Sequence, residues 1–413
     1  MEYDYLKVKE YSYHKEKDLD NKIYYILSFN NSLHIRVSEK AKGLLDKFDG
    51  KHTLKSIVNE LSYEQNTVKE SELIEYIKNV LIKNYLLEGY EVDTKNLKKR
   101  NPNRISIHIP IIESKRFNIL YKLLNLLFNK YFVVLMVTLV LLILSFILYE
   151  AFKRGGIGSD FNNLNSGLII ICEYISLLMH EFGHITAAYR YGISAGKIGV
   201  GIYLIYPVFY VDLTNAWRID NKKRMIIDLG GIYLQVITCI PLYLMYCFIH
   251  NETYLVAAII IAATTFVNLV PVLKLDGYWF LSDCLRLSNI SVKPFESIKV
   301  LILKSINKTN INEKCTNSEK VKGIYSLVYV ISTAVIMTYG VIFSVSLFTN
   351  YSSIISRFKY FLYSLSTGEI SRALILFNNL FILILPIIFI LCTIIKMIII
   401  TGIKGFMKNR KVK

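Results

Sequence analysis

The sequence predicts a mainly α-helical, polytopic membrane protein with about six transmembrane helices and a small α/β, winged-helix-like cytosolic domain at its amino terminus. Hydrophobic residues make up 53% of the 413 residues and charged residues only 20%. The apolar residues gather in long runs after residue 130. By contrast, residues 1–94 are net acidic, although the whole chain carries a formal charge of +17. This composition excludes a disordered chain and an ordinary soluble enzyme.

Six apolar runs are long enough, at about 20 residues, to cross a hydrocarbon layer about 30 Å thick. We therefore expect three parts: a domain at 1–94, a basic linker at 95–130, and a six-span membrane domain at 131–413. The last run contains Pro386, which predicts a kink or a strong tilt there. The predicted spans are 131–149, 168–188, 226–249, 254–273, 324–347 and 373–400.

The positions of Lys and Arg predict the orientation of these spans. Segment 283–323 alone holds eight basic residues, whereas the three alternate loops at 150–167, 250–253 and 348–372 hold five together. Positively charged loops stay on the cytoplasmic side of a membrane. We therefore expect a multi-pass protein of the cell membrane with both termini in the cytosol.

The amino-terminal domain has a different pattern. Two short strands are expected at 24–29 and 32–37, joined by a turn at Asn30 and Asn31. Ser38 is a predicted N-cap, and helices are expected at 39–48, 54–61 and 70–84. Strands combined with three short helices in about 80 residues are typical of a winged-helix module.

The second predicted span contains the sequence HEFGH, from His180 to His184. Residues four apart on a helix lie on the same face, so both imidazoles can reach one metal ion, and Glu181 can address a water on that ion. The alternative is two histidines packed in a buried helix. Ionisable groups inside a membrane are costly and usually functional, which favours the metal site.

A catalytic zinc site needs a third protein ligand. The end of the fourth predicted span reads NLVPVLKLDG, from Asn268 to Gly277. Asp276 follows an apolar helix and a proline. The second and fourth spans run in the same direction through the membrane, so His184 and Asp276 are expected on the same, cytosolic side.

A helical HExxH followed two spans later by N-x2-P-x4-D-G resembles the site-2 proteases, a family of intramembrane zinc metalloproteases. The resemblance covers about 168–283. The segments 206–218 and 275–283 resemble the peptide zinc metalloprotease subgroup. Gly230 and Gly231 stand where many relatives have Gly-Pro.

The resemblance implies that His180, His184 and Asp276 bind Zn²⁺. It also implies that Glu181 is the general base and then the acid, and that Asn268 positions the scissile amide or stabilises its oxyanion.

The amino-terminal domain is similar to PqqD-like domains, which bind the leader of a ribosomally made peptide along a strand edge. The segments IRVSEKAKGLL, from Ile35, and FDGKHTL, from Phe48, carry this resemblance. A winged helix of unspecified use is the alternative. DNA binding is disfavoured because residues 1–94 are net acidic.

Four further acidic residues are weaker candidates. Asp212 and Asp228 are expected to have capping or solvated roles, and Asp283 to be a loop residue or a partner of a histidine. Glu173 lies seven residues before His180 on the same helix face and is expected inside the bundle or along a water path. Segment 196–213 is expected to form a strand pair; the alternative is a packed loop.

These observations predict a zinc endopeptidase that cleaves a peptide precursor at the cytosolic face of the membrane before export. The resemblance implies a modified peptide as substrate, with membrane lipid, an ABC transporter and a peptide-modifying enzyme as partners, and no nucleic acid. One alternative is regulated intramembrane proteolysis of a single-span regulator. The other is a non-proteolytic membrane partner in peptide export or immunity.

Overall fold

The structure is a computed structural model in which the chain divides into two compact units. The first unit consists of Met1–Lys122, Ile185–Ile227 and Ser282–Ser288, and the second of Leu123–His184, Asp228–Leu281 and Asn289–Lys413. The described residues are 4–29, 33–64, 69–89, 105–153, 164–203, 206–272, 274–287, 290, 294–306, 315–349 and 351–369.

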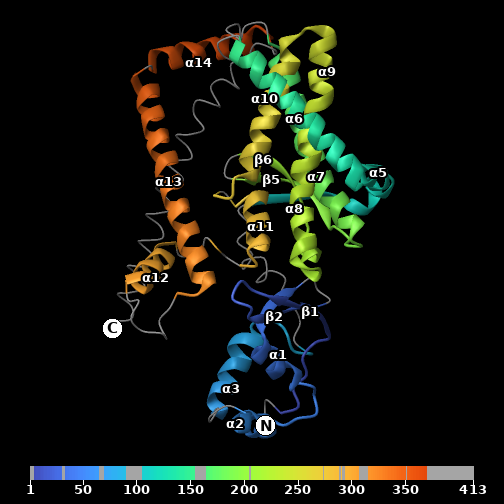
Figure 1. Ribbon diagram of the computed structural model, residues 1–413, viewed down its shortest axis with the longest axis vertical. Helices are drawn as coiled ribbons and strands as arrows, with labels where there is room; N and C mark the ends of the chain where they lie inside the picture. Colours follow the sequence, from blue (N-terminus) through green and yellow to red (C-terminus); the bar gives the residue numbers. More distant parts are fainter. Residues whose placement is uncertain are drawn as a thin grey trace. The chain divides into compact units, whose positions relative to one another are not determined.

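A three-stranded antiparallel sheet opens the first unit (Figure 1). It consists of β1 (Tyr11–Lys17), β2 (Ile23–Phe29) and β3 (His34–Ser38) in the order β1-β2-β3. Strands β2 and β3 confirm the two predicted strands. Strand β1 was not predicted, because its sequence YSYHKEK is dominated by polar and charged side chains.

Helices α1 (Glu39–Asp46), α2 (Leu54–Glu64) and α3 (Glu70–Tyr76) follow this sheet. Helix α3 continues as a π-helical turn, Ile77–Ile82. Ser38 caps α1 as predicted, because its hydroxyl accepts a hydrogen bond from the backbone N–H of Ala41 at 3.3 Å. The three helices confirm those predicted, and the winged-helix assignment stays a prediction. The core between sheet and helices includes Leu27, Phe29, Leu45, Phe48, Ile57, Leu73, Ile77 and Leu81.

A second antiparallel sheet in the first unit consists of β4 (Ile105–Glu113), β5 (Lys197–Tyr203) and β6 (Tyr206–Val211), in that order. Strands β5 and β6 confirm the strand pair expected in 196–213. A side chain at Gly199 would collide with the carbonyl of Ile109 and the ring of Tyr210, so a glycine is required in the central strand.

Part of the stretch interpreted as a linker is folded. Strand β4, the short helices Ser114–Phe117 and Asn125–Phe128, and helix α5 (Asn118–Leu124) all lie between 105 and 128. Residues 95–104 lie outside the described residues.

The second unit is mainly helical, and the described part of the chain contains four helical segments long and apolar enough to cross a membrane, most of whose residues belong to this unit. They are Lys130–Glu150, Gly167–Arg190, Asn221–Ile249 and Glu252–Leu269, which correspond to the first four predicted spans. The fifth predicted span falls in α13 (Asn317–Thr349), which is not one of the four. The sixth lies outside the described residues.

The helices from residue 130 onward are α6 (Lys130–Lys153), α7 (Ser166–Arg190), α8 (Asn221–Ile237), α9 (Cys239–Ile249), α10 (Glu252–Leu269), α11 (Asp276–Cys284), α12 (Pro294–Ile306), α13 and α14 (Tyr351–Ser366).

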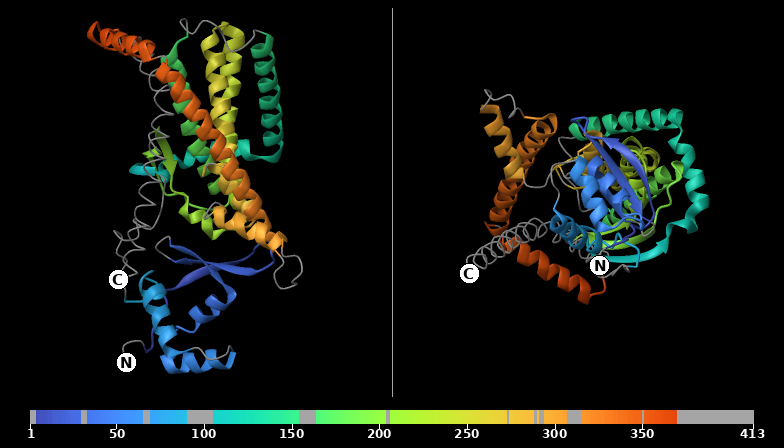
Figure 2. Two further views of the ribbon diagram at one scale, coloured as in Figure 1. Left: turned by 90° about the vertical axis from the view of Figure 1, so that its left-hand side faces the viewer. Right: turned by 90° about the horizontal axis from the view of Figure 1, so that it is seen from below.

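Helices α6, α9 and α10 pack side by side (Figure 2). Ile143 and Ile147 of α6 share a buried cluster with Cys239 of α9 and with residues of α10 such as Ala258. His250 adopts a left-handed conformation, φ 57°, that ends α9 and allows an immediate turn into α10. Many apolar side chains of α6 are exposed, as expected for a surface that faces lipid.

Candidate metal centre

Helix α7 places two buried imidazoles next to each other. The side chains of His180 and His184 are 8% and 7% exposed, and their Nε2 atoms are 3.0 Å apart. Their rings are nearly perpendicular, at 85°. This arrangement follows from the four-residue spacing, which puts both side chains on one face of the helix.

The Asp276 carboxylate, at the first residue of α11, meets this pair. Its Oδ2 atom lies 2.8 Å from Nε2 of His180 and 3.5 Å from Nε2 of His184. The three ligand atoms lie within 4.8 Å of one another, and no other metal-ligating group of three residues occurs in the described part of the chain. The structure therefore brings together the three residues that the sequence singled out.

The three atoms fit a zinc ion. In a tetrahedral site with ligands about 2.0–2.2 Å from zinc, the ligand atoms lie about 3.3–3.6 Å from one another. The observed 2.8, 3.0 and 3.5 Å are close to these values. Two nitrogens and one carboxylate oxygen are also the ligand types that zinc takes in hydrolytic sites.

The Asp276 carboxyl carries the charge that such a cation needs. Burial by itself would raise its pKa, but His184 and His180 together hold the pKa of Asp276 well below its ordinary value. The side chain of Asp276 is only 22% exposed. A buried carboxylate is costly unless a cation compensates it.

Two glycines allow α7 and α8 to approach closely beside the two imidazoles. A side chain at Gly231 of α8 would collide with Nε2 of both His184 and His180. A side chain at Gly183 of α7 would collide with the backbone of Gly230, so the two helices meet backbone to backbone. In the sequence, Gly230 and Gly231 stand out only as a departure from relatives. The collision at Gly231 shows that this glycine leaves space for the imidazoles.

The loop before Asp276 is held by two contacts within the second unit. The hydroxyl of Tyr325, on α13, donates a hydrogen bond to the carbonyl oxygen of Pro271 at 2.7 Å. A side chain at Gly277 would collide with the backbone of Leu269, so the start of α11 lies directly against the end of α10. These contacts fix the position of the first residue of α11, Asp276, and so of its carboxylate.

Gln235 contacts the centre although the sequence analysis did not select it. Its Oε1 atom lies 2.9 Å from Nδ1 of His180, and its side chain is fully buried. Asn268, near the end of α10, donates from Nδ2 to the same Oε1 at 3.5 Å. A polar amide in the mainly apolar run 226–249 was the available signal, since polar groups inside membranes are usually functional.

The two glutamates of α7 lie in different surroundings. Glu181 follows His180 directly and is half-buried. Glu173 interacts with Thr264 of α10 through its side chain, while its Oε2 is buried and makes no hydrogen bond in the described part of the chain. This position agrees with the expectation that Glu173 lies inside the bundle.

The other aspartates do not join the centre. Asp212 is exposed, as expected for a solvated residue, and its Oδ1 accepts hydrogen bonds from the backbone N–H of Thr214 at 3.0 Å and from the hydroxyl of that residue. Asp228 is half-buried within α8. Asp283 was expected in a loop or beside a histidine, and both expectations are wrong, because it lies in α11 and pairs with Arg224.

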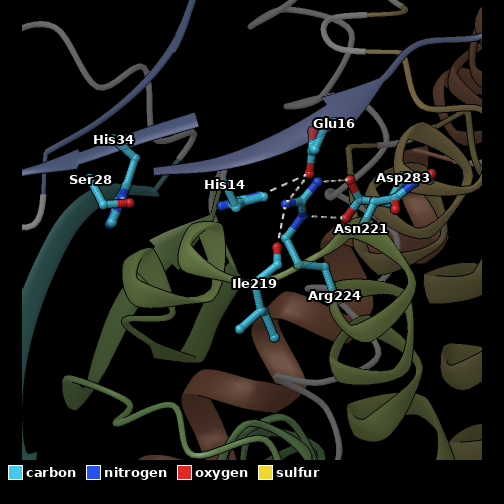
Figure 3. A network of polar contacts seen from close by, with 8 residues as sticks. All are labelled: His14, Glu16, Ser28, His34, Ile219, Asn221, Arg224 and Asp283. Atoms are coloured by element: carbon cyan, nitrogen blue, oxygen red, sulfur yellow. Dashed lines mark hydrogen bonds and ion pairs between the residues drawn. The ribbon is translucent and has the colours of Figure 1, made fainter. Parts of the chain in front are cut away.

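Arg224 is the centre of a buried ion-pair network in the first unit (Figure 3). Its guanidinium donates to Asp283 from Nε at 2.9 Å and from NH2 at 2.7 Å. Its NH1 donates to Glu16 of β1 and to the carbonyl of Ile219. His14 lies 3.3 Å from Glu16, so strand β1 is joined to the first residues of α8.

The chain is similar to a protein of Bacillus subtilis (strain 168) named "Putative peptide zinc metalloprotease protein YydH", with 28% identity over 141 residues. The matched stretch covers 33% of this chain and 56% of the relative, so the chain spans about half the length of that relative. No protein-family model matches the chain, and no solved structure matches it.

Proposed function

We propose that this protein is a membrane-bound zinc endopeptidase of the site-2 type that cleaves a peptide precursor. The convergence of His180, His184 and Asp276 carries this proposal, because two buried imidazoles and a half-buried carboxylate with ligand atoms within 4.8 Å of one another are the donor set of a hydrolytic zinc site. The similarity to a protein named as a peptide zinc metalloprotease supports the same reaction.

His180, His184 and Asp276 would hold the zinc ion. Zinc in such a site polarises a carbonyl group and lowers the pKa of water towards about 7. Glu181, the neighbour of His180 in the motif, takes a proton from the attacking water and returns it to the leaving amine. Such acid–base catalysis is worth about 10²–10⁴-fold in rate.

Asn268 has a proposed role in holding the substrate amide or the oxyanion that develops from it. Its position near the end of α10, with its amide directed at Gln235, supports a fixed orientation of this side chain. A scissile peptide must bind in extended form, because a helix hides its carbonyl groups from attack.

The substrate and partners are proposed from the resemblance in the sequence. A modified, ribosomally made peptide would be cleaved at the cytosolic side of the membrane and then exported by an ABC transporter. The excess of Lys and Arg in the segment 283–323 supports cytosolic termini.

The test is cleavage of the candidate precursor by purified protein in detergent, followed by mass spectrometry. We expect a defined product that disappears with a chelator and returns when zinc is added back. The variant Glu181→Gln should keep stoichiometric zinc but lose turnover by at least about 10²-fold. Cleavage at the wild-type rate by Glu181→Gln would exclude Glu181 as the base. Stoichiometric zinc without cleavage of any candidate peptide would instead support a non-proteolytic membrane partner.

A further inference from the structure

We propose that Gln235 is a positioning residue that fixes which nitrogen of His180 carries the proton, and so prepares His180 Nε2 to bind the metal. This inference rests on the proposed zinc site and deepens it. It is carried by a chain of hydrogen bonds through α7, α8 and α10 in which each donor and acceptor is determined by the next.

The chain begins at the backbone of α10. The hydroxyl of Thr264 donates to the carbonyl oxygen of Ile261 at 3.0 Å. A hydroxyl has a single proton, and Thr264 has two acceptors for it, the carbonyl oxygen of Ile261 and the Glu173 carboxylate. Towards Gln235, whose Nε2 lies 3.4 Å away, Thr264 Oγ1 is therefore the acceptor and Nε2 is the donor.

The orientation of the Gln235 amide follows from this step. With Nε2 directed at Thr264, the acceptor Oε1 is directed at His180. Nδ2 of Asn268 points at the same Oε1 at 3.5 Å, which agrees with an acceptor at that position. Gln235 is fully buried, so bulk solvent does not reach this amide.

His180 must therefore donate from Nδ1, across 2.9 Å, to Gln235 Oε1. In a neutral imidazole with the proton on Nδ1, Nε2 keeps its lone pair. That Nε2 atom faces Asp276 Oδ2 and His184 Nε2 at 2.8 and 3.0 Å. The reversed amide would place the proton on Nε2, where it would block metal binding.

A hydrogen bond to the second nitrogen of a metal-binding histidine increases metal affinity. Partners that fix the other nitrogen of a metal-binding histidine typically contribute about 10–100-fold to metal affinity. The usual partners are a carboxylate, a backbone carbonyl or water, whereas here the acceptor is a buried amide whose own orientation is set by Thr264.

The experiment measures zinc affinity by competition with a chromogenic chelator, using the full chain in detergent. Gln235→Met is nearly isosteric and lacks the acceptor, and we expect it to bind zinc about 10–100-fold more weakly. Gln235→Glu keeps an acceptor for Nδ1–H and should retain most of the wild-type affinity. A role in packing alone predicts the opposite order, because Met fills the apolar site better than a carboxylate does.

A second pair of variants tests the inference without changing Gln235. Thr264→Val removes the acceptor that orients the amide and should weaken zinc binding by less than Gln235→Met does. Thr264→Ser keeps the hydroxyl and should restore the affinity. The absorption spectrum of the cobalt-substituted protein should change with Met and Val, and remain as in the wild type with Glu and Ser.

The outcomes separate this inference from the proposed function. Wild-type protein that binds no zinc would refute the proposed zinc site itself. Wild-type protein that binds zinc, with equal affinity in Gln235→Met or with equal losses in the Met and Glu variants, would refute only the assignment to Gln235. If Met and Glu both fail to fold, as judged by thermal unfolding, equal affinities of the Thr264→Val and Thr264→Ser proteins would overturn it.

Discussion

Helix α11 carries two half-buried aspartates seven residues apart, and their surroundings differ. Asp283 accepts two hydrogen bonds from the guanidinium of Arg224, at 2.9 and 2.7 Å. Asp276 meets the imidazoles of His180 and His184, which are its ion-pair partners in the part of the chain that the structure describes. One carboxylate is compensated by a permanent cation of the chain. The other faces two side chains that are neutral when they act as ligands.

The two aspartates differ in the charge of their partners, and this difference favours a metal ion at Asp276. Burying a carboxylate costs free energy unless a positive charge lies next to it. Arginine stays charged under all ordinary conditions, but Arg224 shares its single charge between Asp283 and Glu16, and burial raises the pKa of the Asp283 carboxyl despite this partner. At Asp276 the neighbours are nitrogen ligands, so a divalent cation is the compensation that fits this set.

The largest effect is expected from comparing the two aspartates directly. Asp276→Asn removes the ionised ligand and should abolish stoichiometric zinc binding, a greater loss than the roughly 10–100-fold that follows removal of an outer partner. Asp283→Asn, on the same helix, should keep zinc and lower folding stability instead. Metal analysis of both purified variants checks this prediction. Equal zinc content in the two variants would remove the distinction between the sites.

Removing the permanent cation should affect stability and leave the metal ligands in place. Arg224→Met leaves Glu16 and Asp283, whose side chains are 13% and 15% exposed, without their cation. We expect a loss of about 3–5 kcal/mol in the free energy of unfolding, measured by denaturation in detergent.

Arg224→Lys is the matched control, and it should lie between wild type and Met because an ammonium cannot form the two-pronged contact with Asp283. Unchanged unfolding of the Met variant would mean that the network does not contribute to stability.

The next prediction concerns zinc binding when the space beside His180 and His184 is reduced. Gly231→Ala introduces a methyl group that collides with both imidazoles, and we expect a cost of about 1–3 kcal/mol in zinc binding. Gly43 of α1 has no atom within 4 Å of the position of an added Cβ. Gly43→Ala should therefore leave zinc affinity unchanged and stabilise its helix by about 0.5–1 kcal/mol. Isothermal titration with zinc distinguishes the two variants.

The smallest effect concerns the pH dependence of the Arg224 network. Burial alone would raise the pKa of Glu16, but His14 and Arg224 lower it below its ordinary value. A carboxyl with a lowered pKa stabilises the folded state above the unfolded pKa, about 4.3, and this contribution is lost as the pH falls through the folded pKa.

Glu16→Gln should lack this component, so its free energy of unfolding should fall less between neutral and acidic pH than that of the wild type. Unfolding curves between neutral pH and about pH 3, with a chelator present throughout, measure it. Parallel pH profiles for the two proteins would show that Glu16 does not contribute.

The helices that the sequence predicts are largely those observed, because apolar length and turn residues are local properties. The spans at 131–149 and 168–188 lie within α6 and α7. Strands β1 and β4 were not predicted. Strand β1 lacks an apolar pattern, and β4 pairs with β5, which lies far away in the sequence.

For the site, the sequence by itself determined the ligand types and their helix face. Asp276 was selected as the third residue because it follows an apolar span and a proline on the predicted side of His184, and because N-x2-P-x4-D-G resembles the site-2 protease motif. Only the tertiary structure decided that Gln235 contacts His180, that Gly231 leaves room for both imidazoles, and that Asp283 belongs to Arg224. The physical reason is that helix periodicity is set by neighbouring residues, whereas these contacts depend on how separate helices approach one another.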